Sequence, residues 1–301
     1  MTTTTADEIL RPEPEELRFD YKKIMAHPAF YPVVILIAGL MIGFWHFLKG
    51  LPQIWTDKTT EYYSHGPLVP FMTAFIIWKA WPRIREYPVK RCWPAIIPLL
   101  FALFLYSAGV GVEWAPLLSV AFVLAAFSAA WILLGSKWAG ALVVPIGYLI
   151  FMTPFIPESW IDRGTNILQQ YSARIAVAML DLTGFDPLPD INDPTTVYLG
   201  NFVMNVGVAC SGLKTIIAVI AFTVFFVSIA RLNFWANMIM FVSMLPIALF
   251  INGLRIAMIG VVGDYYGSDA GMKFHDYSGY IALVICFVII FKIARWLGWK
   301  D

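Results

Sequence analysis

The chain has 301 residues, of which 59% are hydrophobic and only 14% are charged, and its formal net charge is +1. An average soluble domain carries about 25% charged residues, so this composition excludes an ordinary soluble protein and indicates an integral membrane protein surrounded by membrane lipids. The basic residues gather in one loop and form no basic face with stacking aromatics, so no nucleic-acid partner is expected.

Residues 1–30 form a polar segment with a run of threonines and a stretch rich in proline and glutamate. They lack the basic-then-apolar order of a cleaved signal peptide, so we expect the first apolar stretch to be a retained anchor. We therefore predict two parts, a polar cytoplasmic tail over 1–30 and a single membrane-embedded domain over 31–301. No internal repeat is visible, which weighs against an inverted-repeat transporter.

Eight apolar stretches follow, most of them close to the roughly 20 residues that cross a 30 Å hydrocarbon layer as a helix. They cover about 31–48, 66–81, 94–111, 115–134, 138–156, 213–230, 235–262 and 279–297. The ten-residue alternating segments of a membrane β-barrel are absent. The sequence thus predicts an all-α, polytopic bundle of about eight transmembrane helices.

The distribution of lysine and arginine sets the expected orientation. The loop over 79–91 carries five basic residues against the single acid Glu86, and such loops stay in the cytoplasm. With eight spans both termini are then cytoplasmic, in a cell (inner) membrane, and the long segment over 157–212, which is richer in acids, lies outside.

This outer segment is expected to contain a helix and a hairpin. From 160 to 182 apolar residues recur at helical spacing, which indicates a helix lying on the membrane surface. An extra span is the alternative, but it would place Arg231 and the basic C-terminus outside, against the charge rule. Further on, 195–199 and 202–206 flank Gly200-Asn201, a plausible β-hairpin with a two-residue turn.

The hairpin leads to Cys210, where the sixth span begins. Unpaired N–H groups at a helix start and the nearby Lys214 would lower the pKa of a thiol, so a reactive thiolate is plausible, although a lone cysteine also occurs simply as a small hydrophobe. Ser211 is a candidate N-cap, and Gly212 would let a substrate backbone approach closely. Cys92 and Cys286 have no spacing typical of a disulfide framework or a zinc site.

Arg255 lies inside the seventh span, where a guanidinium costs at least about 2.5 kcal/mol at mid-bilayer. This cost implies that Arg255 has a binding partner inside the protein or a functional role, unless its side chain extends to the membrane interface. Gly253, Ala257 and Gly260 form a small-residue stripe on which another helix can pack closely and hold Arg255 inside the bundle.

His275 opens the eighth span from outside, with Asp276 beside it. A loop histidine is often merely solvated, but its near-neutral pKa suits proton transfer.

Three of these regions resemble the signature regions of the exosortase/archaeosortase family: the run 208–213, Val-Ala-Cys-Ser-Gly-Leu; the run 252–256, Asn-Gly-Leu-Arg-Ile; and His275. The runs over 63–70 and 153–157 resemble earlier motifs of that family. The resemblance covers about 60–280. It implies a membrane enzyme that recognises exported proteins by a C-terminal tail with a short Pro-containing motif, a transmembrane helix and a basic end. It also implies cleavage near the motif and transfer to an envelope acceptor, on the outer side and without metal, nucleotide or redox cofactor.

The resemblance also implies roles for the three residues. Cys210 would form a thioacyl intermediate, His275 would protonate the departing amine and later activate the acceptor, and Arg255 would hold the carbonyl or oxyanion. His65 would line the substrate entrance or assist. Supporting or substrate-binding positions are then His65, Ser211, Gly212, Lys214, Asn252 and Asp276.

Two other classes remain open. A transporter would use Arg255 to bind an anion, and a glycosyl- or acyltransferase of envelope polymers would work at the same face, although no Asp-x-Asp motif occurs in the outer loops. In both, Cys210 would be dispensable.

Overall fold

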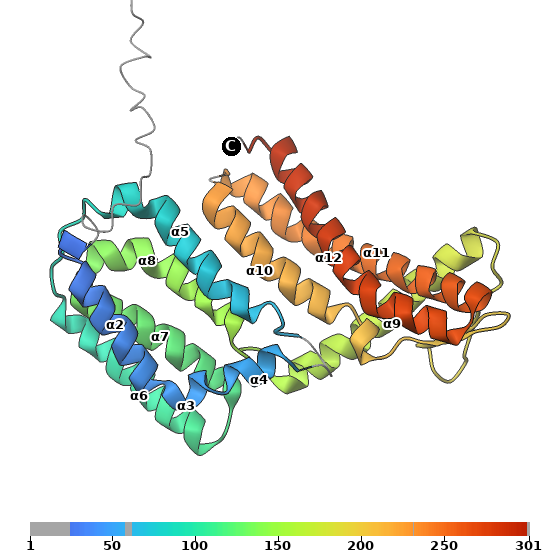
Figure 1. Ribbon diagram of the computed structural model, residues 1–301, viewed down its shortest axis with the longest axis horizontal. Coiled ribbons are helices and arrows are strands. Elements are labelled where there is room, and N and C mark those ends of the chain that lie inside the picture. Colours follow the sequence, from blue (N-terminus) through green and yellow to red (C-terminus); the bar gives the residue numbers. More distant parts are fainter. Residues whose placement is uncertain (1–24, 58–61, 231, 300–301) are drawn as a thin grey trace, which may run out of the picture.

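The computed structural model describes residues 25–57, 62–230 and 232–299, and most of them are helical. Figure 1 shows two groups of helices side by side, an N-terminal group (α2 to α8) and a C-terminal group (α10 to α12), with α9 crossing the back of the second. The helices are α2 (Phe30–Gly43), α3 (Trp45–Leu48), α4 (Leu51–Trp55), α5 (Val69–Ile84), α6 (Ile96–Gly111), α7 (Ala115–Leu134), α8 (Ser136–Tyr148), α9 (Glu158–Leu182), α10 (Leu213–Ala230), α11 (Phe234–Tyr266) and α12 (Ser268–Trp296). Short 3₁₀ turns are η1 (Gly66–Leu68), η2 (Trp93–Ala95), η3 (Leu149–Met152) and η4 (Val208–Cys210).

Five described helices are long and apolar enough to cross a membrane: η2 with α6, and α7, α10, α11 and α12. A sixth is reached if α2 and the segment Trp45–Trp55, bent by 72°, form one broken span. The protein is therefore an all-α, multi-pass membrane protein, but the expected eight spans are not confirmed. The stretch expected over 66–81 forms a helix of only 16 residues, and that over 138–156 gives way to a 3₁₀ turn after Tyr148.

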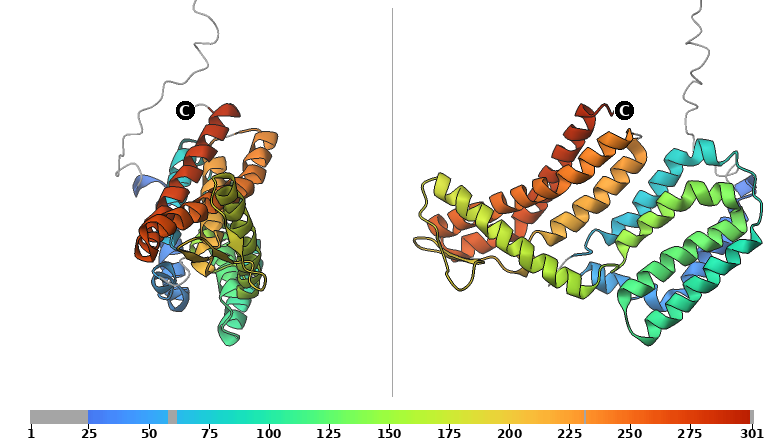
Figure 2. Two further views of the ribbon diagram at one scale, coloured as in Figure 1. Left: turned by 90° about the vertical axis from the view of Figure 1, so that its right-hand side faces the viewer. Right: turned by 180° about the vertical axis from the view of Figure 1, so that it is seen from behind.

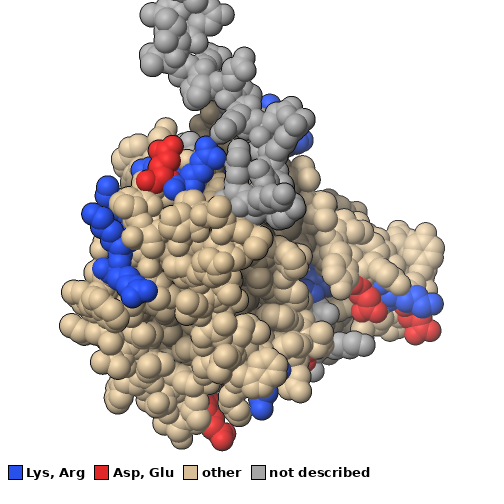
Figure 3. Space-filling model, turned by 60° about the vertical axis from the view of Figure 1, so that its left-hand side comes forward, with Lys and Arg blue, Asp and Glu red and all other residues tan. Residues whose placement is uncertain are grey.

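The surface agrees with a membrane setting. Figure 3 shows a broad area without charged side chains, with lysine, arginine and acidic residues gathered toward its margins. Many large apolar side chains of α2 and α6, such as Ile42 and Phe104, are exposed, as helices that face lipid require. The orientation of the chain and the side on which its termini lie stay predictions, and most of the expected 1–30 tail falls outside the described residues.

The N-terminal group packs around a core that includes Phe44, Leu51, Val69, Phe122 and Tyr148. The loop expected to be cytoplasmic is fixed to the end of α7, because the backbone N–H groups of Lys90 and Cys92 donate to the carbonyls of Leu134 and Ile132. Gly135, with φ 95°, ends α7, and a Cβ there would overlap the Lys90 carbonyl.

The outer segment forms a three-stranded antiparallel sheet in the order β1 (Leu188–Pro189), β2 (Thr196–Tyr198), β3 (Val203–Asn205). Strands β2 and β3 pair with Val197 opposite Met204, and Gly200-Asn201 lies at the turn between them. The Asn201 N–H donates to Asp264 Oδ1 at 2.6 Å, which ties the turn to the end of α11.

Helix α9 is not among the candidate spans and packs against α11. The face that it buries is polar and small, with Thr165, Gln169, Ser172, Ala173 and Ala176. The apolar residues from which a surface helix was predicted do not form one common face. Ile175 packs on Gly253, whereas Tyr171 and Leu182 are exposed. Helix α9 packs on the stripe of small residues at Gly253, as predicted, and Leu199 covers Gly260, but Arg255 is held by α12 and not by the helix on the stripe.

Helices α11 and α12 are longer than their apolar stretches, at 33 and 29 residues. They are joined at Gly267, which has φ 89°, and they approach closely where a Cβ on Gly271 would lie 3.1 Å from the Gly263 Cα. Because α12 begins at Ser268, His275 lies two turns inside this helix, whereas the expectation that it opens the membrane span from outside stays a prediction.

Candidate active site

The chain around Cys210 is held by side chains from two helices. The Asn252 Nδ2 on α11 donates to the Cys210 carbonyl at 2.9 Å and to Ser172 Oγ on α9 at 2.9 Å. Ser172 Oγ in turn donates to the Ser211 carbonyl at 3.4 Å. The Cys210 N–H closes the 3₁₀ turn onto the Gly207 carbonyl at 2.9 Å. The cysteine backbone is thus fixed from both sides.

The entry into α10 depends on Ser211 and Gly212. Ser211 Oγ accepts from the Leu213 N–H at 3.2 Å and so provides a partner for the first N–H of α10, although Gly212 and not Ser211 directly precedes the helix. Gly212 has φ 83°, a left-handed conformation that favours glycine, and a Cβ there would lie 2.8 Å from Asn252 Nδ2. The space beside Gly212 is therefore filled by Asn252, so the absence of a Gly212 side chain serves the Asn252 contact, and the substrate approach expected there stays a prediction.

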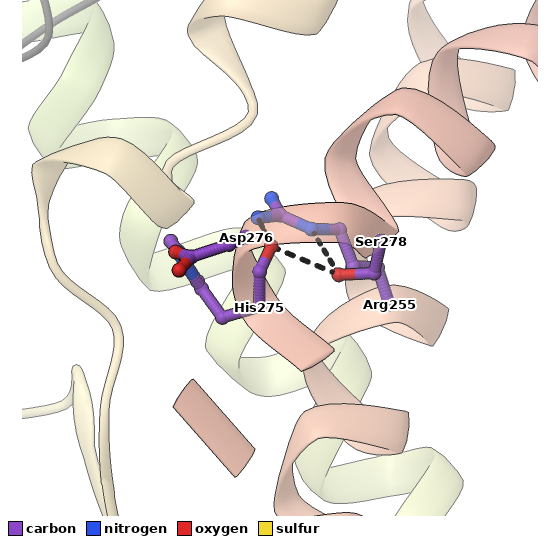
Figure 4. A network of polar contacts seen from close by, with 4 residues as sticks. All are labelled: Arg255, His275, Asp276 and Ser278. Atoms are coloured by element: carbon purple, nitrogen blue, oxygen red, sulfur yellow. Dashed lines mark hydrogen bonds and ion pairs between the residues drawn. The ribbon is translucent and has the colours of Figure 1, made fainter. Parts of the chain in front are cut away.

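Arg255 is buried between α11 and α12, with 9% of its surface exposed. Its Nε donates to Ser278 Oγ at 3.1 Å and its Nη2 donates to the His275 carbonyl at 3.1 Å, as Figure 4 shows. Ser278 Oγ also donates to the His275 carbonyl, at 3.2 Å. The guanidinium is held by protein groups, so the alternative of an Arg255 side chain that extends to the membrane interface does not hold.

The Cys210 thiol does not have the expected electrostatics. Burial raises the pKa of Cys210 above its usual value, and the positive charge of Arg255 opposes this shift. Lys214 lies over the ring of Tyr280 on α12, with 5.4 Å from Nζ to the ring centroid. The expected lowering of the Cys210 pKa is wrong, because loss of hydration disfavours the thiolate more than Arg255 favours it.

His275 is half-buried, and its Nδ1 lies 3.2 Å from Asp276 Oδ1. Figure 4 shows both side chains extending to the same side of α12, away from Ser278. Within the described residues no hydrogen bond joins the His275 ring to the Cys210 thiol. The carbonyl of His275, and not its imidazole, makes the contact with Arg255.

Cys210, Arg255, His275 and the residues that hold them lie in a part of the chain that matches a known protein family. The family model of the transmembrane exosortases matches residues 55–292. The chain belongs to the exosortase family. No curated protein and no solved structure shows a significant match. Exosortase membership supports, in general terms, a role in the processing of sorting signals.

The earlier exosortase-like motifs lie beside the start of α10. Tyr62 and Tyr63 pack with Ile217 and Leu213, and the Tyr62 hydroxyl is 3.0 Å from Thr165 Oγ1 on α9. The Ile156 N–H donates to the Tyr63 hydroxyl at 3.4 Å. The two early motif regions therefore meet each other and α9 near the cysteine segment.

His65 follows these tyrosines and stacks on Tyr63, with 6.5 Å between ring centroids. Neither ring nitrogen has a hydrogen-bond partner of regular geometry within the described residues. Burial lowers the pKa of His65 to about 4, and the Phe151 backbone offsets only part of this effect. His65 is therefore neutral at pH 7, and its predicted role at the substrate entrance stays a prediction.

Sequence reasoning missed the polar groups of α9. Thr165, Gln169 and Ser172 lie on the buried side of α9. Thr165 meets the Tyr62 hydroxyl, Gln169 Nε2 donates to the Val206 carbonyl at 3.0 Å, and Ser172 Oγ donates to the Ser211 carbonyl. Their spacing of four and three residues places them on one face of a helix, so the pattern carried a usable signal. Ser278, which receives Arg255, was also missed.

The two most distinct pockets of the described chain lie away from these residues. One, of about 600 Å³, is lined by Phe185, Tyr198 and Asp264, among others, and the second, of about 470 Å³, by Arg174, Pro187 and Asp190. Neither is lined by Cys210, Arg255 or His275. Both belong to the β-strand region of the outer segment.

Proposed function

We propose that this protein is a membrane cysteine peptidase and transpeptidase that cleaves the C-terminal sorting tails of exported proteins through a thioacyl intermediate on Cys210. The observation that carries the proposal is the position of Arg255. Its charge acts on the Cys210 thiol, and its guanidinium donates to the His275 carbonyl. These contacts support a site shared by the cysteine segment before α10, by α11 and by α12.

The chemistry begins at the sulfur. Cys210 gives its proton to His275, and its Sγ attacks the carbonyl carbon of the scissile peptide bond. The carbonyl oxygen gains negative charge, which a buried guanidinium stabilises strongly because little water competes. When the C–N bond breaks, His275 gives its proton to the leaving amine, and the exported protein remains on Cys210 as a thioester.

The second half of the reaction releases the protein. His275 takes a proton from a water, hydroxyl or amine acceptor, which attacks the thioester carbon. The bond from carbon to Sγ breaks, and the proton returns to the thiolate. Water as acceptor gives hydrolysis, whereas an envelope acceptor gives transfer.

The raised pKa of Cys210 fits an enzyme that is inactive until substrate arrives. Burial keeps the thiol neutral, and the His275 ring pairs with Asp276. Catalytic hydrogen bonds are often long before the substrate complex forms, so a rotation of His275 toward Cys210 on substrate binding would complete the pair. Asp276 would then favour the protonated imidazole.

Substrate and orientation complete the proposal. The substrates are exported proteins with a short motif, a transmembrane helix and a basic end, and the site lies on the outer side of the inner membrane. The basic loop over 79–91, fixed to the end of α7, supports this orientation.

The test is processing of a tail-bearing substrate in cells that express Cys210→Ala. We expect processing to stop while the variant accumulates normally, because only one small side chain is removed. Cys92→Ala is the matched control and should process normally. Cys92 lies at the C-terminal end of α7, where its N–H donates to the Ile132 carbonyl, and it is not part of the proposed site. Normal processing by a well-expressed Cys210→Ala protein would exclude the thiol mechanism and favour a transporter or a glycosyl- or acyltransferase.

A further inference from the structure

Asn252 links three parts of the chain at the proposed site. Its side chain is almost fully buried, at 2% exposure, and its amide nitrogen joins α11 to the Cys210 carbonyl and to Ser172 on α9. Through Ser172 the same network reaches the Ser211 carbonyl. Two consecutive carbonyls of the cysteine segment therefore depend on one amide group.

The orientation of this amide follows from its partners. A backbone carbonyl can only accept a hydrogen bond, so the nitrogen of Asn252 and not its oxygen must face Cys210. This orientation leaves Asn252 Oδ1 buried without a hydrogen-bond partner in the described part of the chain. A buried unpaired acceptor lowers the stability of the fold, so the side chain is placed for its two donated hydrogen bonds at the expense of stability.

Two fixed carbonyls determine where the thiol can go. Each peptide group is planar, so holding the Cys210 and Ser211 carbonyls against α11 and α9, with the Cys210 N–H on the Gly207 carbonyl, restricts the direction in which the Cα–Cβ bond of Cys210 points. Gly212 adds to this restraint because its left-handed backbone lies directly against the Asn252 amide. Without these contacts the segment could turn and expose the sulfur to water.

We propose that Asn252 is a positioning residue that holds the half-buried Cys210 side chain in place. The proposal rests on the proposed thiol mechanism and adds a residue to it. It predicts an unusual combination: loss of the Asn252 amide makes the thiol more accessible and the protein less active.

The experiment uses the full chain in membranes, with Cys92 and Cys286 replaced by alanine so that only Cys210 reacts. Asn252→Ala should raise the iodoacetamide alkylation rate of Cys210 at pH 7 several-fold, since the sulfur gains contact with water. In co-expression, processing of a tail-bearing substrate should fall at least tenfold. Alkylation of Cys210 does not depend on cleavage, so it still tests the positioning role if the proposed function itself fails.

The matched control is Asn237→Ala. Asn237 is also on α11, also donates to a backbone carbonyl, that of Leu232 at 3.3 Å, and also has a buried Oδ1 without a partner in the described chain. It lies about four turns before Asn252, so its replacement should leave both readouts unchanged. A general weakening of α11 would instead change both variants alike and would overturn the proposal.

Asn252→Asp keeps the size of the side chain but, when ionised, has only acceptor oxygens to present to the Cys210 carbonyl. It should reproduce both effects, and it decides the matter if the alanine variant fails to accumulate. Ser172→Ala removes one of the two hydrogen bonds of Asn252 and the hydrogen bond to the Ser211 carbonyl, but it keeps the bond from Asn252 to the Cys210 carbonyl, so it should show the same changes to a smaller extent. An alkylation rate within twofold of the parent in a well-expressed Asn252 variant would refute the positioning role, as would normal processing.

Discussion

Replacement of Gly253 by alanine should separate α9 from α11. An added Cβ would lie 2.7 Å from the Ile175 Cβ and closer still to its Cγ2, whereas carbon atoms in contact stay about 3.5–4.0 Å apart. The helices must therefore move apart by about 1 Å at this point. Overpacking of this kind costs about 1–3 kcal/mol, and the better helix propensity of alanine returns at most about 1 kcal/mol.

The same shift would affect the site. Ser172 and Asn252 come from the two helices that separate, so their 2.9 Å hydrogen bond would lengthen beyond hydrogen-bond distance. We expect a lower midpoint of unfolding in mixed detergent micelles and reduced substrate processing. Ile175→Ala in the same chain should restore part of the stability, because it removes the closest atom but keeps the Cβ.

Gly147→Ala is the control for this substitution, since a Cβ at Gly147 meets nothing within 4 Å. It should leave the midpoint unchanged or raise it slightly through helix propensity. If Gly253→Ala proved as stable as Gly147→Ala, the close packing of α9 on α11 would be refuted.

Three further predictions concern charge and topology. Arg255→Lys should reduce processing at least tenfold while the protein accumulates, because an ammonium lacks the planar fork that reaches Ser278 and His275 together; activity near normal would show that charge alone suffices. Burial raises the pKa of Cys210, so the fraction of Cys210 in the thiolate form should stay low at pH 8. Alkylation of Cys210 at pH 8 should therefore be slower than alkylation of a free thiol, and its rate should keep rising above pH 9. A rate that reaches a plateau below pH 8 would contradict this prediction. In a Cys-free background, an impermeant maleimide should label Ser268→Cys in intact cells but not Arg85→Cys, and the reverse pattern would invert the orientation.

The sequence predicted helices well where the boundary of an apolar run coincides with a glycine of positive φ that interrupts the helical backbone. The stretch over 115–134 coincides with α7, which stops at left-handed Gly135, and that over 213–230 coincides with α10. Hydropathy failed where helix and membrane boundaries differ. Residues 268–278 are polar, yet they form the first turns of α12, because hydropathy measures contact with lipid and not backbone conformation.

The break after Gly43 had no counterpart in the sequence analysis. The apolar run continues through it, but the chain bends by 72°, since the direction of a helix depends on packing with its neighbours. A single stretch over 31–48 was therefore predicted where the structure has α2 and α3, and α4 lies beyond that stretch.

The candidate site was predictable in its chemistry but not in its electrostatics. The motifs identified Cys210, Asn252 and Arg255. In the structure, Asn252 donates a hydrogen bond to the Cys210 carbonyl, and the positive charge of Arg255 acts on the Cys210 thiol. The sign of the Cys210 pKa shift could not be predicted, because it depends on how much water the fold excludes from the sulfur. The role of Ser172 required knowing that α9 lies against α11.

The length of α11 has a geometrical consequence for substrates. Arg255 lies 21 residues after Phe234, which is about 32 Å along a helix at about 1.5 Å per residue. The hydrocarbon layer is about 30 Å thick. With Phe234 at the inner boundary, as the proposed orientation requires, the guanidinium would lie at the outer boundary. Under the proposed function, a substrate helix of ordinary length would then present the residue just before its apolar stretch at this height. Insertion of a few extra polar residues between the motif and that stretch would lift the scissile bond out of reach, so spacing as well as motif would select the substrates.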